Sequence, residues 1–520
     1  MREICELLWR NKRFFLLVTL AALALRLLFV FDFPHVSGDS FLYGDIAKNL
    51  LNHGVFGLSD GASVSPTLAR VPGYPGFLAA VFSVFGQDHY TAVLIVQAVL
   101  DTNTCLVIAA LALQLCGARA AKAAYLLAAF CPFTACYAGV ALAETLAIFC
   151  TAHAFYYGVR GLRALEAGKR STGCWIAAGL WTATGIFMRP EGGLVMAALG
   201  LALVVQLFRP QKKNAVVLAG VLLITASLSP LVPWTVRNWR VFHVFQPLAP
   251  ASANDPDEFV AYGFGHWART WVVDFVSVEE VEWPVDGEPV NIHQLPERAF
   301  DSRTEYESTE NLIAAYNRQL RIDPALDAQF DRLARERMMH NPFRYYIWLP
   351  FLRTADMWLR PRTELLPIES RWWEFSEHPA ESAFAVAWAA LNLGYLVAAF
   401  WGWLRSRLGT CGVALAGYVL LRSAFLSTLG NPEPRYVLEC FPILLALAAC
   451  GLAGPIARSL NTEKRSQQRE PGRTFQTLCF LCSFALQTRT FASKFQERPM
   501  PHKKARRFWP AGQIKRSILG

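Results

Sequence analysis

Apolar runs long enough to cross a bilayer recur along the chain, separated by polar and basic segments. A hydrocarbon core of about 30 Å needs about 20 apolar residues in a helix. The first run, residues 14–31, follows a basic leader. We interpret it as a retained anchor and not a cleaved signal peptide, because Arg26 interrupts its second half and no clear cleavage site follows. The pattern predicts about ten spans: 14–31, 91–115, 121–139, 142–159, 173–188, 192–208, 215–235, 381–403, 411–428 and 436–456.

The positively charged residues between these runs predict the orientation of the chain. Lys and Arg concentrate in the cytoplasmic loops of membrane proteins. Here they follow every second predicted span, at Arg119 and Lys122, Arg160 to Arg170, Arg209 to Lys213, Arg405 and Arg407, and Arg458 to Arg469. All these loops agree on one orientation. It places the first outer loop, 32–90, and the long segment 240–378 outside.

The segments between the spans predict smaller helices. Pro72–Phe85 is apolar but short, which favours a re-entrant or surface-lying helix. Residues 240–378 are long for a loop and show a weak helical pattern in Asn311–Met339, so we expect a small extracytoplasmic cap. Phe343–Trp358 is amphipathic and is expected to lie at the membrane interface. The basic tail is expected to be disordered or to lie on the membrane surface.

The predicted fold is therefore an all-α polytopic membrane protein. It has about ten or more transmembrane helices, amphipathic interfacial helices and a small extracytoplasmic loop domain. Four regions follow from this division of the chain. They are an N-terminal transmembrane module (1–239) with the outer loop 32–90, an extracytoplasmic region (240–380), C-terminal transmembrane helices (381–458) and a cytoplasmic tail (459–520).

Composition supports a membrane protein and excludes other classes. The chain is 54% hydrophobic and only 17% charged, less charge than a soluble protein carries. The net charge of +10 suggests nucleic acid as a partner, but the basic residues lie between spans, so we expect membrane lipids and no nucleic acid. None of the twelve Cys lies in 32–90 or 240–378, which argues against a disulfide framework. We interpret the pair Cys479 and Cys482 as incidental.

Two carboxylates are candidates for chemistry because both fall at the outer mouth of a predicted span. Asp39 follows the first span, and Glu144 opens a later one. Carboxylates at the edge of hydrocarbon are costly and usually functional. Asp39 also precedes a helical pattern of apolar residues in 41–51, so the role of a simple helix N-cap stays open for it. A plain capping role also stays open for Glu144.

Several arginines fall at the same interface under this topology. Arg70 precedes the short apolar helix and could bind a phosphate or anchor to lipid headgroups. Arg189, Arg237 and Arg435 lie in other outer turns, although Arg189-Pro190-Glu191 could be a turn with an internal ion pair. Arg26 could line the site or pair with a carboxylate within the bundle. Polar residues inside the second span are interpreted as contacts between helices: Gln97, Asp101 and Asn103.

Carboxylates and guanidiniums around one pocket suit group transfer from a phosphate leaving group. An acid takes the proton of the acceptor, and cations stabilise charge on the departing phosphate. The sequence contains no Walker-type Gly-rich loop, and nucleotides are scarce outside the cell. A lipid-linked phosphate is therefore the expected activated donor.

The order of these motifs resembles the C-class membrane glycosyltransferases, especially bacterial members of the protein O-mannosyltransferase and aminoarabinose transferase group. The similar pieces lie within about residues 14–456. They are Leu25-Arg26-Leu27, Gly38-Asp39-Ser40 with Tyr43, Arg70-Val71-Pro72-Gly73-Tyr74-Pro75, Ala143-Glu144-Thr145, Arg189-Pro190, Pro233-Trp234-Thr235-Val236-Arg237-Asn238 and Glu433-x-Arg435-Tyr436.

The resemblance implies an inverting transfer of a sugar from a polyprenyl-monophosphate carrier to an acceptor lipid, glycan or protein. It implies catalytic roles for Asp39 and Glu144 and a phosphate contact for Arg70. The other residues that it implies in substrate binding are Tyr43, Arg26, Arg189, Glu191, Arg237, Glu433, Arg435 and Tyr436. It also implies a bacterial inner membrane, with the site on the periplasmic face.

Departures from the family pattern change two expectations. Ser40 and Ala69 stand where relatives often have acids, so we predict no metal site and no cofactor, although a divalent metal stays open. The segment 240–378 does not look like the sugar-binding module of the eukaryotic members, so a protein acceptor does not follow. The alternative function is a transporter or flippase of lipid-linked sugars, which needs ionisable groups near the midplane and two related halves. Asp101 is the best residue for it. A membrane scaffold without chemistry is a second alternative.

Overall fold

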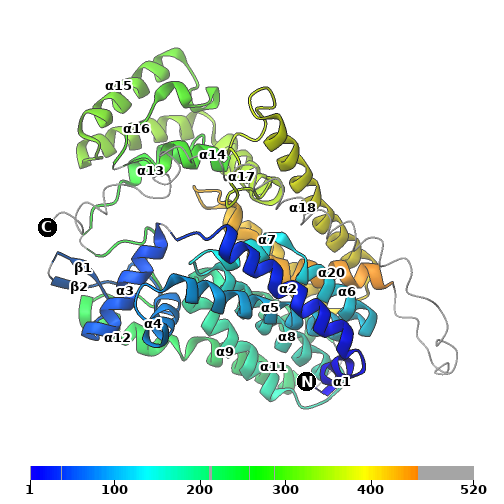
Figure 1. The fold of residues 1–520 in the computed structure, drawn as a ribbon. Helices are drawn as coiled ribbons and strands as arrows, with labels where there is room; N and C mark the ends of the chain where they lie inside the picture. The colour runs from blue at the N-terminus through cyan, green and yellow to red at the C-terminus, as the bar shows by residue number, and fades with distance from the viewer. Residues whose placement is uncertain are drawn as a thin grey trace.

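The computed structural model describes residues 2–36, 38–61, 63–209, 213–256, 258–285 and 287–454. A bundle of long helices makes up most of the molecule, and a smaller helical group lies at one end of it (Figure 1). Several predictions fall outside the described residues. They concern Ser37, Lys212, the end of the last span, the basic residues from Arg458 onward, and the tail 459–520 with Cys479 and Cys482.

Helices occupy every stretch that the hydrophobic pattern marked as a span. The bundle comprises α1 (Arg2–Arg10), α2 (Lys12–Asp32), α5 (Tyr90–Cys116), α6 (Ala118–Ala129), α7 (Pro132–Ala135), η1 (Cys136–Gly139), α8 (Glu144–Glu166), α9 (Thr172–Met188), η2 (Pro190–Gly193), α10 (Leu194–Leu207), α11 (Lys213–Leu228), α12 (Leu231–Phe242), α18 (Pro379–Arg405), α19 (Thr410–Ser427), η7 (Pro434–Cys440) and α20 (Phe441–Ala453).

Within the described residues, seven helical stretches are long and apolar enough to cross a membrane, or up to eight if α6 and the helices after it form one span bent by 51°. The chain is thus a multi-pass membrane protein. The helices α8 and α9 fall outside that set, and α9 has only 17 residues. Their crossing of the membrane stays a prediction. Apolar side chains point outward from the bundle, as lipid-facing residues do, among them Leu16, Leu17, Leu20, Val217, Val221, Ile224, Val397 and Phe400.

The centre of the bundle is built from small and apolar side chains. The mostly buried helix α20 packs against α18, α6 and α5. Alanines at these contacts, such as Ala109, Ala120 and Ala124, are fully buried. Without a bulky side chain the helix backbones approach closely, which is how helices associate inside a bilayer. This dense packing fixes the outer ends of the helices, where the candidate site residues lie.

A buried ion pair ties α2 to α5 and α6. The Nε of Arg26 lies 2.8 Å from Oδ2 of Asp101, and both side chains are almost completely buried. The same guanidinium donates to the carbonyl of Ala128 at 3.0 Å, at the end of α6. The structure therefore corrects the expectation that Arg26 binds substrate and bears out the alternative of a partner within the bundle. Gln97 likewise connects elements, accepting from Tyr74 and donating to the carbonyl of Val140.

The first outer loop contains α3 (Asp39–His53), the hairpin of β1 (Gly57–Asp60) and β2 (Ser63–Pro66), and α4 (Gly73–Phe85). The two strands pair antiparallel and form the one sheet among the described residues, which the sequence did not predict. The helix α4 has the short apolar form expected of residues 72–85. It packs on α3 and against the end of α9.

The segment after α12 folds into a cap with its own hydrophobic cluster around Trp267, Trp271 and Phe330. In Figure 1 the cap lies above the bundle, with α17 between them. Its elements are α13 (Tyr262–Arg269), α14 (Phe275–Ser277), η3 (Val278–Glu282), η4 (Ile292–Gln294), η5 (Glu297–Ala299), α15 (Arg303–Gln319) and α16 (Pro324–His340). The return to the bundle runs through η6 (Arg344–Trp348) and α17 (Leu349–Leu359). Exposed aromatic residues on this return, such as Tyr346, Trp348 and Phe351, suit a membrane interface.

Candidate functional site

Asp39 is the first residue of α3 and its carboxylate faces Arg70. The residue before the helix is Gly38, whose φ of 54° lies in the region that favours glycine. No side chain caps this helix end, so the interpretation of Asp39 as a simple N-cap is wrong. Instead, Oδ1 of Asp39 accepts a hydrogen bond of 2.9 Å from Nη2 of Arg70. The Asp39 side chain is 36% exposed, so it is open to solvent.

Arg70 lies in the loop between β2 and α4 and contacts α3 at two points. Besides its bond to Asp39, its guanidinium lies 5.9 Å from the ring centroid of Tyr43, one helical turn further along α3. The end of this loop can lie close to the end of α9 because residue 73 is a glycine. A Cβ at Gly73 would lie 2.4 Å from the carbonyl oxygen of Phe187 near the end of α9. The motif around Arg70 is therefore pressed against the segment that carries Arg189.

Arg237 was expected to bind substrate, but in the structure its side chain bonds to backbone carbonyls of the first outer loop. Its guanidinium donates to the carbonyls of Thr67 and Phe56, both at 2.7 Å. The carboxylate of Asp255 accepts from the amide of Leu68 at 2.8 Å in the same place. Arg237 is thus a positioning residue that fixes the strand end leading to Arg70, and the structure does not bring it to the carboxylates. The charge pattern predicted on which side of the membrane Arg237 lies, but it carried no information on the direction of the side chain.

Glu144 is the first residue of α8 and is buried between two arginines. Its Oε1 accepts a hydrogen bond of 2.7 Å from Nη1 of Arg189 and lies 3.3 Å from Nη1 of Arg435. The side chain is only 4% exposed. Its second oxygen, Oε2, is buried and has no hydrogen-bond partner among the described residues. Buried polar atoms are normally paired, so an unpaired carboxylate oxygen points to a missing donor group.

A chain of ion pairs extends from Arg189 into the bundle. The Nε of Arg189 lies 2.7 Å from Glu191, which is the internal ion pair considered for this turn, and 3.6 Å from Glu439. Arg422 donates to both oxygens of Glu439, at 3.0 and 2.8 Å. Arg422 and Glu439 were not among the site residues predicted from the sequence. Their signal was a charged residue inside each of two apolar spans, which is expensive unless the residues pair or function.

The turn before α20 supplies the other side of the site. Nε of Arg435 lies 2.5 Å from Oε2 of Glu433. The hydroxyl of Tyr436 donates to the other oxygen of Glu433 at 2.7 Å. The ring of Tyr436 packs under Arg189, with 4.9 Å between guanidinium and ring centroid. Glu433, Arg435 and Tyr436 therefore join the group around Glu144, as we expected from the side of the membrane predicted for all of them.

Electrostatic interactions connect the Asp39 and Arg70 pair with the Glu144 group. Partial burial raises the pKa of Asp39. The charges of Arg70 and Arg435 and the hydrogen bond from Arg70 lower this pKa by more, so it lies below its ordinary value. Burial and the charge of Asp39 raise the pKa of Tyr43 to about 12, and Glu144 contributes to this rise. Asp39 is therefore ionised at neutral pH, and Tyr43 remains a neutral hydroxyl.

The assembled site contains five carboxylates and four guanidiniums. They are Asp39, Glu144, Glu191, Glu433 and Glu439, and Arg70, Arg189, Arg422 and Arg435. Asp39 and Arg70 are the pair most open to solvent, at 36% and 20%, while Glu144 and Glu439 are almost fully buried. Such an arrangement can accept a proton and bind an anion at neighbouring points. No group of three or more His, Cys, Asp or Glu side chains in the described chain is placed to hold a metal ion.

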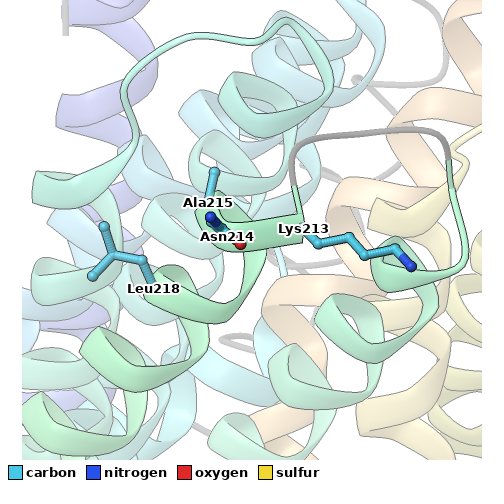
Figure 2. A pocket seen from close by; sticks show the side chains of 4 residues that line it. All are labelled: Lys213, Asn214, Ala215 and Leu218. Atoms are coloured by element: carbon cyan, nitrogen blue, oxygen red, sulfur yellow. The ribbon is translucent and has the colours of Figure 1, made fainter.

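One hollow of the described surface lies away from this site. Figure 2 shows it at the start of α11, lined by the exposed residues Lys213, Asn214, Ala215 and Leu218. Its volume is about 480 Å³. None of the candidate site residues lines it.

Residues 69–234 match the sequence family described as dolichyl-phosphate-mannose-protein mannosyltransferase. The matched segment contains Arg70, Glu144, Arg189 and Glu191, and it ends before Arg237. The match confirms, for about a third of the chain, the resemblance to the C-class membrane glycosyltransferases. It shows what residues 69–234 are similar to and covers less than half of the chain. No curated protein matches the sequence.

Solved structures with a similar arrangement of helices include two kinds of membrane protein. The oligosaccharyltransferase of Archaeoglobus fulgidus, determined with a tethered acceptor peptide, is 13% identical with a TM-score of 0.47, over 85% of this chain and 50% of its own. The same values hold for its complex with an inhibitory peptide and a dolichol-phosphate. ArnT from Cupriavidus metallidurans, bound to undecaprenyl phosphate, is 14% identical with a TM-score of 0.37, over 84% and 77%. The chain spans about half the length of the archaeal enzyme.

Proposed function

We propose that this protein is an inverting glycosyltransferase that moves a sugar from a polyprenyl-monophosphate carrier to an acceptor on the outer face of the membrane. The observation that carries the proposal is the contact of 2.9 Å between Arg70 and Asp39 at the solvent-open edge of a group of arginines. The family match of residues 69–234 supports the reaction class. Asp39 lies outside that match, so its role depends on the geometry.

Asp39 acts as the general base in this proposal. Its carboxylate takes the proton from the acceptor hydroxyl while the acceptor oxygen attacks the anomeric carbon. The bond between that carbon and the phosphate oxygen breaks, and the lipid phosphate leaves with the electron pair. Attack opposite the leaving group inverts the anomeric centre. The ionised state of Asp39 at neutral pH and its exposure of 36% suit this task.

Arg70 and Arg435 stabilise the charge that develops on the leaving phosphate. A guanidinium offers paired N–H donors that match phosphate oxygens. Arg70 now bonds to Asp39, so a donor phosphate would compete with Asp39 for it. This competition weakens the stabilisation of the Asp39 carboxylate and makes it a stronger base when the donor is bound. Donor binding would thus prepare the base before the acceptor arrives.

Glu144 orients substrate hydroxyls and the arginines around the phosphate. Its Oε1 holds Arg189 and Arg435 in position. Its unpaired Oε2 can accept a hydrogen bond from a hydroxyl of the sugar. The prenyl tail of the donor would lie in the bilayer against the apolar outer faces of the helices. We place the site on the periplasmic face of a bacterial inner membrane, following the distribution of basic residues between spans. A transporter of lipid-linked sugars would need a free ionisable group within the bundle, but Asp101 is committed to Arg26.

The variant Asp39→Asn tests the proposal. The purified protein is mixed with membranes from cells that lack it and with undecaprenyl-phosphate donors carrying labelled mannose, glucose or arabinose. We expect the wild type to transfer label from one donor and Asp39→Asn to lose transfer by about 100-fold or more. Asp88→Asn is the matched control, since Asp88 lies in the same outer loop, pairs with Lys48 on the surface and is 55% exposed. Near-normal transfer by folded Asp39→Asn would refute the role of Asp39.

A further inference from the structure

Buried Tyr137 and partly buried Glu364 form a polar pair next to the proposed site. The hydroxyl of Tyr137 donates a hydrogen bond of 2.9 Å to Oε1 of Glu364, although 227 residues separate them in the sequence. Tyr137 lies in η1, and Glu364 lies in the segment between α17 and α18. Neither residue was selected by the sequence analysis, and the proposed chemistry uses neither.

The pair is connected to both sides of the Glu144 group. The backbone carbonyl of Tyr137 accepts from the hydroxyl of Thr145, the neighbour of Glu144, at 3.0 Å. Arg362, two residues before Glu364, donates to the carbonyl of Pro434, the neighbour of Arg435, at 2.7 Å. The segments that carry the pair are therefore bonded to the direct neighbours of Glu144 and Arg435.

The segment that carries Glu364 is held firmly in place. Besides its bond to Pro434, the buried Arg362 donates to the carbonyl of Met357 at 3.1 Å. The indole of Trp388 donates to the carbonyl of Arg362 at 3.0 Å. Arg360 donates to the carbonyl of Ser370 at 2.8 Å, which closes the segment into a loop. Binding a ligand at Glu364 therefore requires little reorganisation of its backbone.

Two buried carboxylate oxygens near Tyr137 lack hydrogen-bond donors within the described chain. They are Oε2 of Glu364 and Oε2 of Glu144. An ionised carboxylate only accepts hydrogen bonds, whereas a tyrosine hydroxyl both donates and accepts. Two free acceptors with one adaptable hydroxyl match a ligand that presents several hydroxyl groups on a small frame. Sugars have this chemistry.

We propose that Tyr137, Glu364 and Oε2 of Glu144 form the subsite that binds the hydroxyls of the donor sugar. The inference rests on the proposed function and names the part of the site that holds the transferred group. Tyr137 is hydrogen-bonded to Thr145, the neighbour of Glu144, whereas Tyr43 lies beside Arg70, so Tyr137 lies on the Glu144 side of the site. The acceptor reaches the solvent-open side at Asp39. The sugar then occupies the buried side, next to the arginine that holds its phosphate.

Binding of two probes to the full protein in lipid nanodiscs tests this assignment. One probe is undecaprenyl phosphate, and the other is the undecaprenyl-phosphate hexose that the wild type accepts. We expect Glu364→Gln and Tyr137→Phe to weaken binding of the glycosylated lipid by about tenfold, the value of one buried hydrogen bond. Binding of undecaprenyl phosphate should stay within about twofold, because the arginines that bind phosphate are unchanged. Glu377→Gln is the control, an exposed glutamate in the same segment.

Donors that lack one hydroxyl provide a test that does not depend on the folding of a variant. One deoxy donor should bind the wild type about tenfold more weakly and should lose nothing further in Glu364→Gln. Equal losses on both lipid probes, or no loss on either, would overturn the inference. Loss confined to the KM of the acceptor would assign the pair to the acceptor and also overturn it. If the wild type binds neither lipid, the proposed function itself fails.

Discussion

The guanidinium of Arg70 lies 2.9 Å from the carboxylate of Asp39, although 31 residues separate them and they belong to a loop and a helix. The contact joins a candidate base to a candidate phosphate ligand. Arg70 also lies beside Tyr43, and the charges of Arg435 and Arg189 lower the pKa of Asp39. The pair therefore forms one edge of a larger charged group.

The pH dependence of transfer should report the contact between Arg70 and Asp39. Since Arg70 and Arg435 hold the pKa of Asp39 below its ordinary value of about 3.9, the base stays ionised as the pH falls. The kcat/KM of the wild type should therefore keep its plateau down to at least about pH 5. In Arg70→Gln the positive charge next to Asp39 is lost, so the pKa of Asp39 should rise. The fall of kcat/KM at low pH should then begin at a higher pH than in the wild type.

The control for that profile is Arg70→Lys, which retains the positive charge and should keep the acid limb low. Arg303→Gln removes an exposed arginine on the cap, with 80% of its side chain in solvent, and should leave the profile unchanged. An acid limb at the same pH in the wild type and in Arg70→Gln would contradict control of the base by Arg70.

The ion pair of Arg26 and Asp101 should stabilise the bundle and have no part in donor binding. Arg26→Met leaves a buried carboxylate without its partner, which costs about 3–5 kcal/mol of folding free energy. The double variant Arg26→Met with Asp101→Leu should recover most of that loss, because no charge remains buried. Thermal unfolding in detergent measures both. A raised KM for the donor lipid in Arg26→Met, with normal thermal stability, would instead return Arg26 to the site.

The close approach at Gly73 should be needed for activity. An alanine there places its Cβ 2.4 Å from the carbonyl of Phe187, so the start of α4 must move away from the end of α9. Arg70, three residues earlier, should move with it. We expect Gly73→Ala to lower kcat/KM about tenfold or more and to destabilise the fold by about 1–3 kcal/mol. Gly76→Ala, in the same helix with nothing within 4 Å of its added Cβ, should behave as wild type.

Accessibility labelling should place the first outer loop opposite the basic loops. Single cysteines at Asp60 and Asp88, both exposed, are expected to react with a membrane-impermeant maleimide in intact spheroplasts. A cysteine at the exposed Lys169 should react only after permeabilisation. The background carries Cys5→Ser, because Cys5 is exposed. Equal labelling of positions 60 and 169 in intact spheroplasts would refute the predicted orientation.

Much of the fold could be predicted from the sequence because membrane helices are recognised by long runs of apolar residues. Every predicted stretch is helical, and α4 and the segment after Phe343 have the short form that their patterns indicated. The hairpin of β1 and β2 escaped notice because each strand has only four residues. Whether α8 and α9 cross the membrane cannot be read from apolarity, since one carries many polar residues and the other is short.

The candidate site was predictable only to the level of which side of the membrane each residue occupies. That level was sufficient to bring together Asp39, Arg70, Glu144, Arg189, Arg435 and Tyr436. It failed for Arg237 and Arg26, because shared depth does not determine where a long side chain points. Tyr137 and Glu364 lie far apart in the chain, and their contact depends on how the loop after α17 returns to the bundle. Sequence patterns within one helix carry no information about such a contact.

The most direct test follows the lipid and not the sugar. Proteoliposomes containing the protein are supplied with the undecaprenyl-phosphate sugar and acceptor membranes, and release of free undecaprenyl phosphate is measured by mass spectrometry. We predict that the wild type releases undecaprenyl phosphate in proportion to the sugar transferred and that Asp39→Asn releases none above background. Movement of intact sugar-lipid across the bilayer with no free undecaprenyl phosphate, or equal release by both proteins, would contradict this prediction.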